Sequence, residues 1–207
     1  MSLHYVANII RYYKVIQPTF PLLPTSKTNV ASRLANCPPI LKDAFLEALY
    51  ATVRSVTSST DANSARRAAS LVSTCQFDGT AIKSFSDNLI LLSALILMAI
   101  EAGSHVGTRS GSGSQSVWLG AAVGLAFSLK LHVYHADEEQ DSNDNLARRI
   151  WWSLIILDRF HASGTSSPLM IPDTSAVLLV DDVKILGDQT YHLARASPLH
   201  PILSKPH

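Results

Sequence analysis

The sequence predicts an all-α domain, a bundle-like array of about seven to eight helices. Apolar residues recur at intervals of three and four along most of the chain, as they do on helices that cover a core. Two windows, residues 89–100 and 151–157, are apolar on nearly every side, so they are expected inside the fold. With 207 residues, of which 47% are hydrophobic and 16% charged, the chain is long enough for one domain with its own core.

The N-terminal third is expected to hold four helices separated by breaks. The first covers residues 3–16, and the three prolines within residues 18–24 then give an extended apolar connector. A short helix follows at about 25–35, starting from a Thr-Ser cap, and two prolines separate it from the helix at 40–56. The fourth helix, residues 64–77, carries alanines small enough to let a neighbouring helix approach closely.

The middle of the chain holds the most apolar window, residues 89–100. A membrane span needs about 20 such residues, so a buried core helix is the preferred interpretation and a membrane span the alternative. Residues 103–116 are rich in glycine and serine and predict a flexible loop without the pattern of a phosphate-binding loop. Helical spacing returns at 117–131, and an acidic segment, residues 137–144, leads to the next helix.

That next helix, residues 148–159, is the element around which we expect the fold to be built. Trp151 and Trp152 would each bury roughly 150–250 Å², a gross gain of about 4–6 kcal/mol apiece. Asp158 and Arg159 are neighbours about 100° apart, with no counter-charge three or four residues away. Each is therefore expected to pair with another element, and the loss of a sheltered partner would cost about 3–5 kcal/mol.

The C-terminal part is expected to be less regular. A turn at residues 164–168 and a short apolar piece at 176–180 precede the start of one more helix at 187–196. We expect one domain over residues 1–196, incomplete at its C-terminal end, and an irregular tail over 197–207.

Charge and cysteine content exclude several classes of protein. Seventeen Lys and Arg against sixteen Asp and Glu give a net charge of +1, without the basic stripe that nucleic-acid binding normally needs. Cys37 and Cys75 are too few for a Cys-rich zinc cluster or a disulfide framework, and they favour a reducing intracellular compartment. The N-terminus shows no secretory signal sequence.

No catalytic or metal motif emerges from the sequence. There is no Gly-x-Ser-x-Gly elbow, no Gly-x-Gly-x-x-Gly after a strand, and no motif around either cysteine. His132 and His135 are three residues apart with acidic residues beyond, but this spacing is common by chance and no further zinc-ligand pattern accompanies it. We therefore expect no enzyme and no catalytic, cofactor-binding or metal-binding residue.

Two stretches resemble the most recognisable block of the fungal-specific transcription factor domain: Arg148-Arg149-Ile150-Trp151-Trp152-Ser153-Leu154-Ile155-Ile156-Leu157-Asp158-Arg159 and Ser166-Ser167-Pro168-Leu169-Met170-Ile171-Pro172-Asp173. His132 falls on a histidine of the same family, at the end of its Leu-Gly-Leu-His helix. The chain departs from the family at Lys130, where a glycine is usual, and at Gln17, where a histidine is usual. The resemblance covers about residues 3–195. It marks these residues as the structural motif of the family: Arg148, Arg149, Trp151, Trp152, Leu157, Asp158, Arg159, Pro168, Pro172 and His132.

The resemblance implies a regulatory role in the nucleus. The family domain is the middle region of binuclear zinc-cluster transcription factors, and the nearest type is that of sugar-responsive and xylanolytic regulators. Such factors contact DNA, and bind zinc, through a separate N-terminal module that this sequence lacks, so no cofactor is expected in this chain. Protein co-regulators or a small metabolite are the expected partners. A helical small-molecule-binding or protein-interaction domain without a transcriptional role is the alternative.

Overall fold

The computed structural model describes residues 3–57, 62–77, 84–104, 114–133, 142–175 and 182–186. Across these ranges the chain forms eight α-helices and two 3-10 helices and no strand, which confirms the predicted all-α class. In chain order the elements are α1 (Leu3–Val15), α2 (Lys27–Asn36), α3 (Pro39–Thr57), α4 (Ala62–Phe77), α5 (Phe85–Gly103), α6 (Gln115–Ser128), η1 (Leu131–Val133), α7 (Asn143–Thr165), η2 (Asp173–Ser175) and α8 (Asp182–Leu186).

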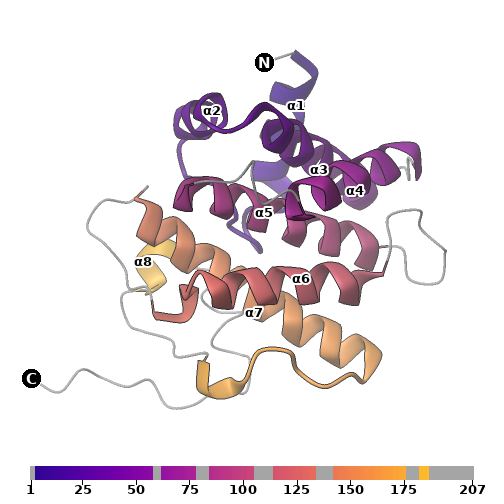
Figure 1. Cartoon of the computed structure of the whole chain (residues 1–207), viewed down its shortest axis with the longest axis vertical. Coiled ribbons are helices and arrows are strands. Elements are labelled where there is room, and N and C mark those ends of the chain that lie inside the picture. Colours follow the sequence, from indigo (N-terminus) through magenta and orange to yellow (C-terminus); the bar gives the residue numbers. More distant parts are fainter. Residues whose placement is uncertain are drawn as a thin grey trace, which may run out of the picture.

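Helix α5 is the centre of the molecule (Figure 1). It packs against α3 and α4 on one side and against α6 and α7 on the other. Every residue from Leu89 to Ala99 is buried, as the apolar pattern predicts. The helix is long and apolar enough to cross a membrane, but 67% of its most apolar window is buried by the rest of the protein, as in the core helix of a soluble fold.

Helix α5 begins four residues earlier than its apolar window predicts, because a capping box sets its start. The Asp87 backbone N–H donates to Ser84 Oγ at 3.0 Å, and the Ser84 N–H donates to Asp87 Oδ2 at 3.3 Å. These two bonds satisfy donors that a helix start otherwise leaves unpaired, so the polar first turn is helical too.

The connector after α1 is held on the core by two side chains. The buried Tyr12 hydroxyl donates to the Phe20 carbonyl at 2.6 Å and accepts the Leu22 N–H at 3.0 Å. Gln17 donates to the Leu23 carbonyl at 3.0 Å and accepts the Leu23 N–H at 3.4 Å. The amide of Gln17 therefore has a structural role at the position where the family usually has histidine, and Leu22 and Leu23 of the connector are buried in the core.

Helix α7 is longer than the sequence predicts. Ser142 caps its start by accepting the Asn145 N–H at 3.1 Å, and the helix continues to Thr165 before Ser166 ends it with a left-handed φ of 54°. Asp158 and Arg159 consequently lie inside the helix and not at its end. The periodic pattern alone could not show this extension, because the last turns carry small and polar residues.

Several predictions fall on parts of the chain that lie outside the described residues. They are the short apolar piece at 176–180, the helix at 187–196, the tail at 197–207, and most of the glycine-rich loop and of the acidic segment.

Candidate functional site

The motif of α7 forms the candidate site, and the two indoles of the motif lie in the protein interior. Trp151 and Trp152 are 0% and 1% exposed. The Trp151 ring packs edge-on against Phe127 of α6, with centroids 5.5 Å apart, and lies 6.0 Å from the ring of His132. His132 also contacts Phe127, so the three rings form one aromatic cluster where α6, η1 and α7 meet.

Trp152 and Arg148 together hold Asp182 of α8. Arg148 donates from Nε and Nη2 to the two oxygens of Asp182 at 2.8 and 2.7 Å, and the Trp152 Nε1–H donates to Oδ2 at 3.2 Å. The Arg148 guanidinium also lies 5.3 Å above the Trp152 ring. All three side chains are buried, so this paired contact fastens a short, sequence-distant helix onto α7.

The second charged cluster holds the segment that follows α7. Asp158, fully buried, accepts the backbone N–H groups of Met170 and Ile171 at 3.1 and 3.0 Å. Arg159 donates to Asp158 at 2.8 Å, to the Ile171 carbonyl at 3.1 Å and to Asp173 at 2.8 Å. The expectation that these two neighbours would each pair with another element is right, but it missed that they also pair with each other.

The remaining motif residues shape the fold around these clusters. Leu157 and Arg149 are buried. Pro168 and Pro172 are exposed in the returning segment, and the Pro172 carbonyl accepts the Ser175 N–H at 2.9 Å where η2 begins. Burial raises the pKa of Tyr12 well above its ordinary value, although the nearby Arg149 charge acts in the opposite direction.

The turn before His132 forms in spite of the departure at Lys130. Lys130 takes a left-handed φ of 56°, the conformation for which glycine is favoured, and the Val133 N–H closes the turn onto its carbonyl at 3.1 Å. The left-handed backbone conformation therefore explains why the family usually has glycine here. In this chain Lys130 adopts that conformation with some backbone strain.

No metal site is found among the described residues: no group of three or more His, Cys, Asp or Glu side chains lies close enough together to hold an ion. His135, the second histidine of the zinc alternative, lies outside them. Cys37 and Cys75 are both buried free thiols, and burial raises the pKa of Cys37, which disfavours the thiolate that metals and electrophiles need.

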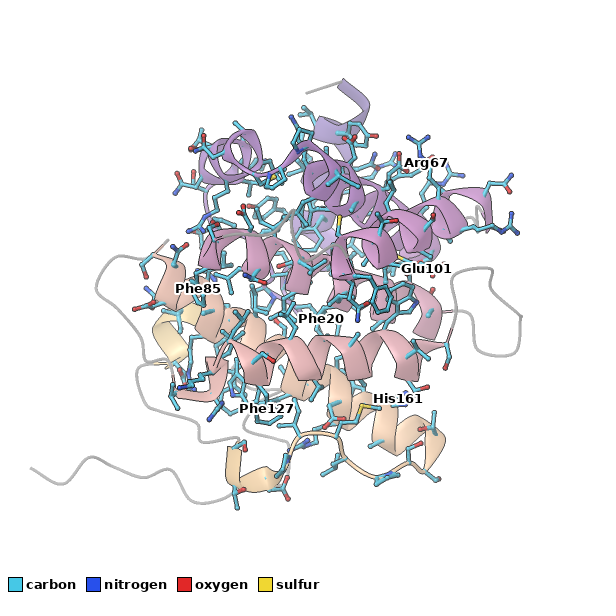
Figure 2. The ribbon with its side chains drawn as sticks, viewed as in Figure 1. Phe20, Arg67, Phe85, Glu101, Phe127 and His161 are labelled. Carbon is cyan, nitrogen blue, oxygen red and sulfur yellow. The ribbon has the colours of Figure 1, made fainter. Side chains whose placement is uncertain are left out.

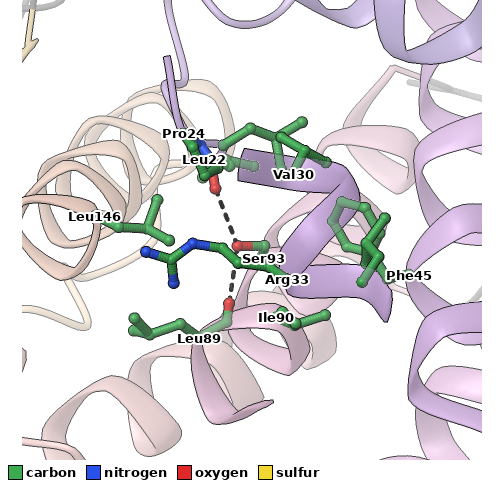
Figure 3. Close-up of a pocket in the computed structure, with 11 residues that line it drawn as sticks. Leu22, Pro24, Val30, Arg33, Phe45, Leu89, Ile90, Ser93 and Leu146 are labelled. Carbon is green, nitrogen blue, oxygen red and sulfur yellow. Dashed lines mark hydrogen bonds between the residues drawn. The ribbon is translucent and has the colours of Figure 1, made fainter. Parts of the chain in front are cut away.

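A small cavity lies between the connector, α2, α5 and the start of α7 (Figure 3). Its wall is apolar, with Leu22, Val30 and Phe45 around it, and Arg33 lies at its side. The empty space is ≈ 290 Å³ when open solvent is included, but only ≈ 20 Å³ admits the centre of a water molecule. Since one water needs roughly 10–15 Å³ on that measure, this cavity is too small for a metabolite in this conformation.

The candidate site is therefore a structural junction. Its polar side chains bind other segments of the same chain, and the cavity described above is lined by none of its ion-paired residues. Sequence reasoning missed Asp182 and Phe127, which complete the two ends of this junction. Neither had a sequence signal, because Asp182 lies 34 residues from Arg148, and Phe127 comes from α6 and is also distant in the chain from Trp151.

Comparison with known proteins shows to which family the chain belongs. The chain matches the fungal specific transcription factor domain over residues 9–182, which includes α7 and Asp182. It belongs to that family. A transcriptional regulatory protein of Schizosaccharomyces pombe, itself described as uncharacterised, is 35% identical over 92% of the chain and 23% of its own length.

Two further relatives of this family domain are shorter matches. A Zn(2)-C6 fungal-type transcription factor of Fusarium oxysporum f. sp. lycopersici is 30% identical over 41% of the chain and 10% of its own length. The cutinase transcription factor 1 beta of Fusarium vanettenii is 33% identical over 42% of the chain and 10% of its own length. No solved structure matches the chain.

Membership of this family confirms that the chain is a transcription-regulator domain and not an enzyme. The chain spans about a quarter or less of the length of these relatives. The zinc cluster named in the Fusarium oxysporum relative could not be built by the two cysteines of this chain.

Proposed function

We propose that this domain controls the output of a longer zinc-cluster transcription factor that acts in the nucleus. In that protein the contact with DNA is made by a separate zinc-binding module, and the helical domain acts on it, or on an activating segment, through contacts within the protein or with co-regulators. We propose residues 1–196 as the extent of the domain. The ten motif residues are proposed as its structural centre, not as a ligand site.

One observation supports this proposal most directly: the polar side chains of the α7 motif bind other segments of the same chain. Arg148 and Trp152 hold α8 through Asp182, and Asp158 holds the segment after α7 through two backbone N–H groups. A motif used in this way maintains a body with a defined surface, and a surface that binds one state of a partner better than another is what control requires.

The class of target genes stays a prediction. The resemblance to sugar-responsive regulators suggests carbohydrate metabolism, whereas one relative is named for cutinase and the others carry no metabolic name.

A reporter experiment tests the proposed role. The full chain is inserted between an unrelated DNA-binding module and an unrelated activating segment, and reporter output is compared with that of the same fusion without the chain. We expect the insertion to change the output several-fold at equal protein level, because a control domain acts on its neighbours. Asp158→Ala should abolish the change by unfolding the junction, whereas Asp173→Ala, at a carboxylate that is 47% exposed, should preserve it.

Output that is unaltered by the insertion, at equal protein level by immunoblot, would argue against a regulatory role. That result would favour the alternative, a helical interaction or ligand-binding domain without a transcriptional function.

A further inference from the structure

The charges of this chain are unevenly distributed between its N-terminal third and the remainder. Residues 1–77 contain eight Lys and Arg against three Asp and Glu, a net charge of +5, and residues 78–207 contain nine against thirteen, a net charge of −4. The overall charge of +1 therefore conceals a strongly basic N-terminal third, which in the fold is the layer of α1 to α4 on one side of α5 (Figure 1).

The helices at the outside of this layer are purely basic. α1, α2 and α4 carry two cations each and no carboxylate: Arg11, Lys14, Lys27, Arg33, Arg66 and Arg67. Only α3, against which α1 and α4 pack, contributes acids to the layer's helices. At the surface of this layer, Arg67 of α4, which is 69% exposed, forms an ion pair with the buried Glu47 of α3 at 3.3 Å, and Tyr5 of α1 donates to the same Glu47 at 3.2 Å.

The outer face of α1 adds apolar groups to this charge. The inner face is fixed on the core by Tyr12 and its neighbours, whereas Val6 and Ile10 are 40% and 38% exposed on the opposite side. Val6, Ile10 and Lys14 are four residues apart and form one row along the helix, with Arg11 in the adjacent row. Aliphatic side chains and cations thus lie side by side on a helix that has no acidic residue.

Within the described part of the molecule, neither Arg11 nor Lys14 takes part in an ion pair. The ion pairs found there are made by other cations, among them Arg67, Arg148 and Arg159. An exposed charge that has no internal partner does not stabilise the fold, but it attracts and orients a partner of opposite sign. The two exposed aliphatic side chains would be desolvated by the same partner, which would add a non-ionic contribution.

We propose that the outer face of α1, defined by Val6, Ile10, Arg11 and Lys14, is a docking surface for an acidic polypeptide segment that carries large apolar side chains. The carboxylates of the segment pair with Arg11 and Lys14, and its apolar side chains cover Val6 and Ile10. A phosphate backbone would use the cations but not the aliphatic row, which is why an acidic peptide fits this face better than a nucleic acid. This proposal does not depend on the transcriptional role.

Fluorescence anisotropy on the full chain tests the surface. The probe is a labelled 20-residue peptide of Glu, Asp, Leu and Phe, and the comparison peptide has serine in place of Leu and Phe. We expect the first to bind more tightly than the second, and both to weaken as salt is raised from 50 to 500 mM, because exposed charge pairs are screened. Lys14→Glu should weaken binding about tenfold, because it sets like charges against each other at the interface.

Ile10→Ser should weaken binding by about threefold through lost apolar contact. The matched control is Lys130→Glu, the same charge change at an exposed lysine just after α6. It should leave affinity within about twofold, because α6 packs on α5 and not on α1, so the added charge is not on the docking surface. Circular dichroism and thermal unfolding establish that each variant is folded.

Three results would overturn the proposal. They are absence of peptide binding by the wild-type chain, equal affinities for wild type and Lys14→Glu, and equally tight binding of the serine peptide. Duplex DNA that bound as tightly as the apolar peptide, with the same sensitivity to Lys14→Glu, would reassign the surface to nucleic acid.

Discussion

At the scale of single residues, Asp158 carries more of the fold than its charge alone suggests. It accepts two backbone N–H groups and an arginine while fully buried. Asp158→Ala should lower the free energy of unfolding by about 3–5 kcal/mol, because it leaves Arg159 and two buried donors without their acceptor. Asp173, the other carboxylate on Arg159, is 47% exposed, and Asp173→Ala should cost only about 0–1 kcal/mol.

Urea unfolding of the two variants measures this difference directly. Equal losses for Asp158→Ala and Asp173→Ala would mean that the buried backbone contacts contribute nothing beyond the surface ion pair.

Tyr12 should make the free energy of unfolding depend on pH in the alkaline range. Burial holds its pKa well above the ordinary value, so the folded state keeps the phenol protonated while the unfolded chain ionises near pH 10. The stabilisation is therefore complete below about pH 10 and is lost as the pH rises above it towards the folded pKa. Urea unfolding between pH 8 and pH 11 should show this decline in the wild type and a smaller one in Tyr12→Phe.

At neutral pH Tyr12→Phe should be less stable by about 1–3 kcal/mol, because the Phe20 carbonyl and the Leu22 N–H lose a buried partner. An alkaline decline of the same size in both proteins would assign the effect to other tyrosines.

Residue-level partners were the part of the site that the sequence could predict least. The indoles of α7 are apolar at helical spacing, so their burial followed from the pattern. Asp182 pairs with Arg148 across 34 residues, and no periodicity connects a helix to a five-residue helix that far away. At Lys130 the departure from the family's glycine gave no reason to expect the usual turn, yet the backbone takes the left-handed conformation there.

At the scale of elements, the helical glycines differ in how much space surrounds them. An added Cβ at Gly120 or Gly124 of α6 would meet nothing within 4 Å, whereas at Gly103, the last residue of α5, it would lie 2.4 Å from Gln115 Nε2. Gln115 contacts His161 Nδ1 at 3.1 Å, so a shift there would disturb the junction of α5, α6 and α7. Figure 2 shows His161 and Phe127 at opposite ends of α6.

Alanine at Gly103 should therefore affect stability differently from alanine at the other two positions. Gly120→Ala and Gly124→Ala should each stabilise the protein by about 0.5–1 kcal/mol, because alanine is favoured over glycine inside an open helix face. Gly103→Ala should stabilise less or destabilise, since Gln115 must move. Thermal unfolding compares the three, and a uniform gain would show that Gln115 moves at no cost.

Element positions were predictable where the apolar period was long, and element ends were not. Seven helices lie where the spacing places them, and α8 was missed because five residues span too few turns to show a period. The ends of α5 and α7 depend on capping and on polar turns, which carry local hydrogen-bond chemistry and not hydrophobic pattern.

At the scale of the whole molecule, α5 joins the two layers into one cooperative unit. The α1–α4 layer and the α6–α8 layer each bury their apolar faces against it, so neither layer keeps its core without the other. All three tryptophans, at 118, 151 and 152, are buried in α6 and α7, whereas helical circular dichroism reports on both layers. The two signals therefore observe different parts of the fold.

Urea unfolding followed by tryptophan fluorescence and by circular dichroism should give coincident curves, because a shared core makes the transition two-state. Leu92→Ala, at a fully buried position on α5, should lower the free energy of unfolding by about 2–5 kcal/mol and shift both curves equally. Were the layers independent, the dichroism curve would instead divide into two transitions and fluorescence would follow only one. The truncation on α5 would then displace the two midpoints by different amounts, because each layer packs on a different side of that helix.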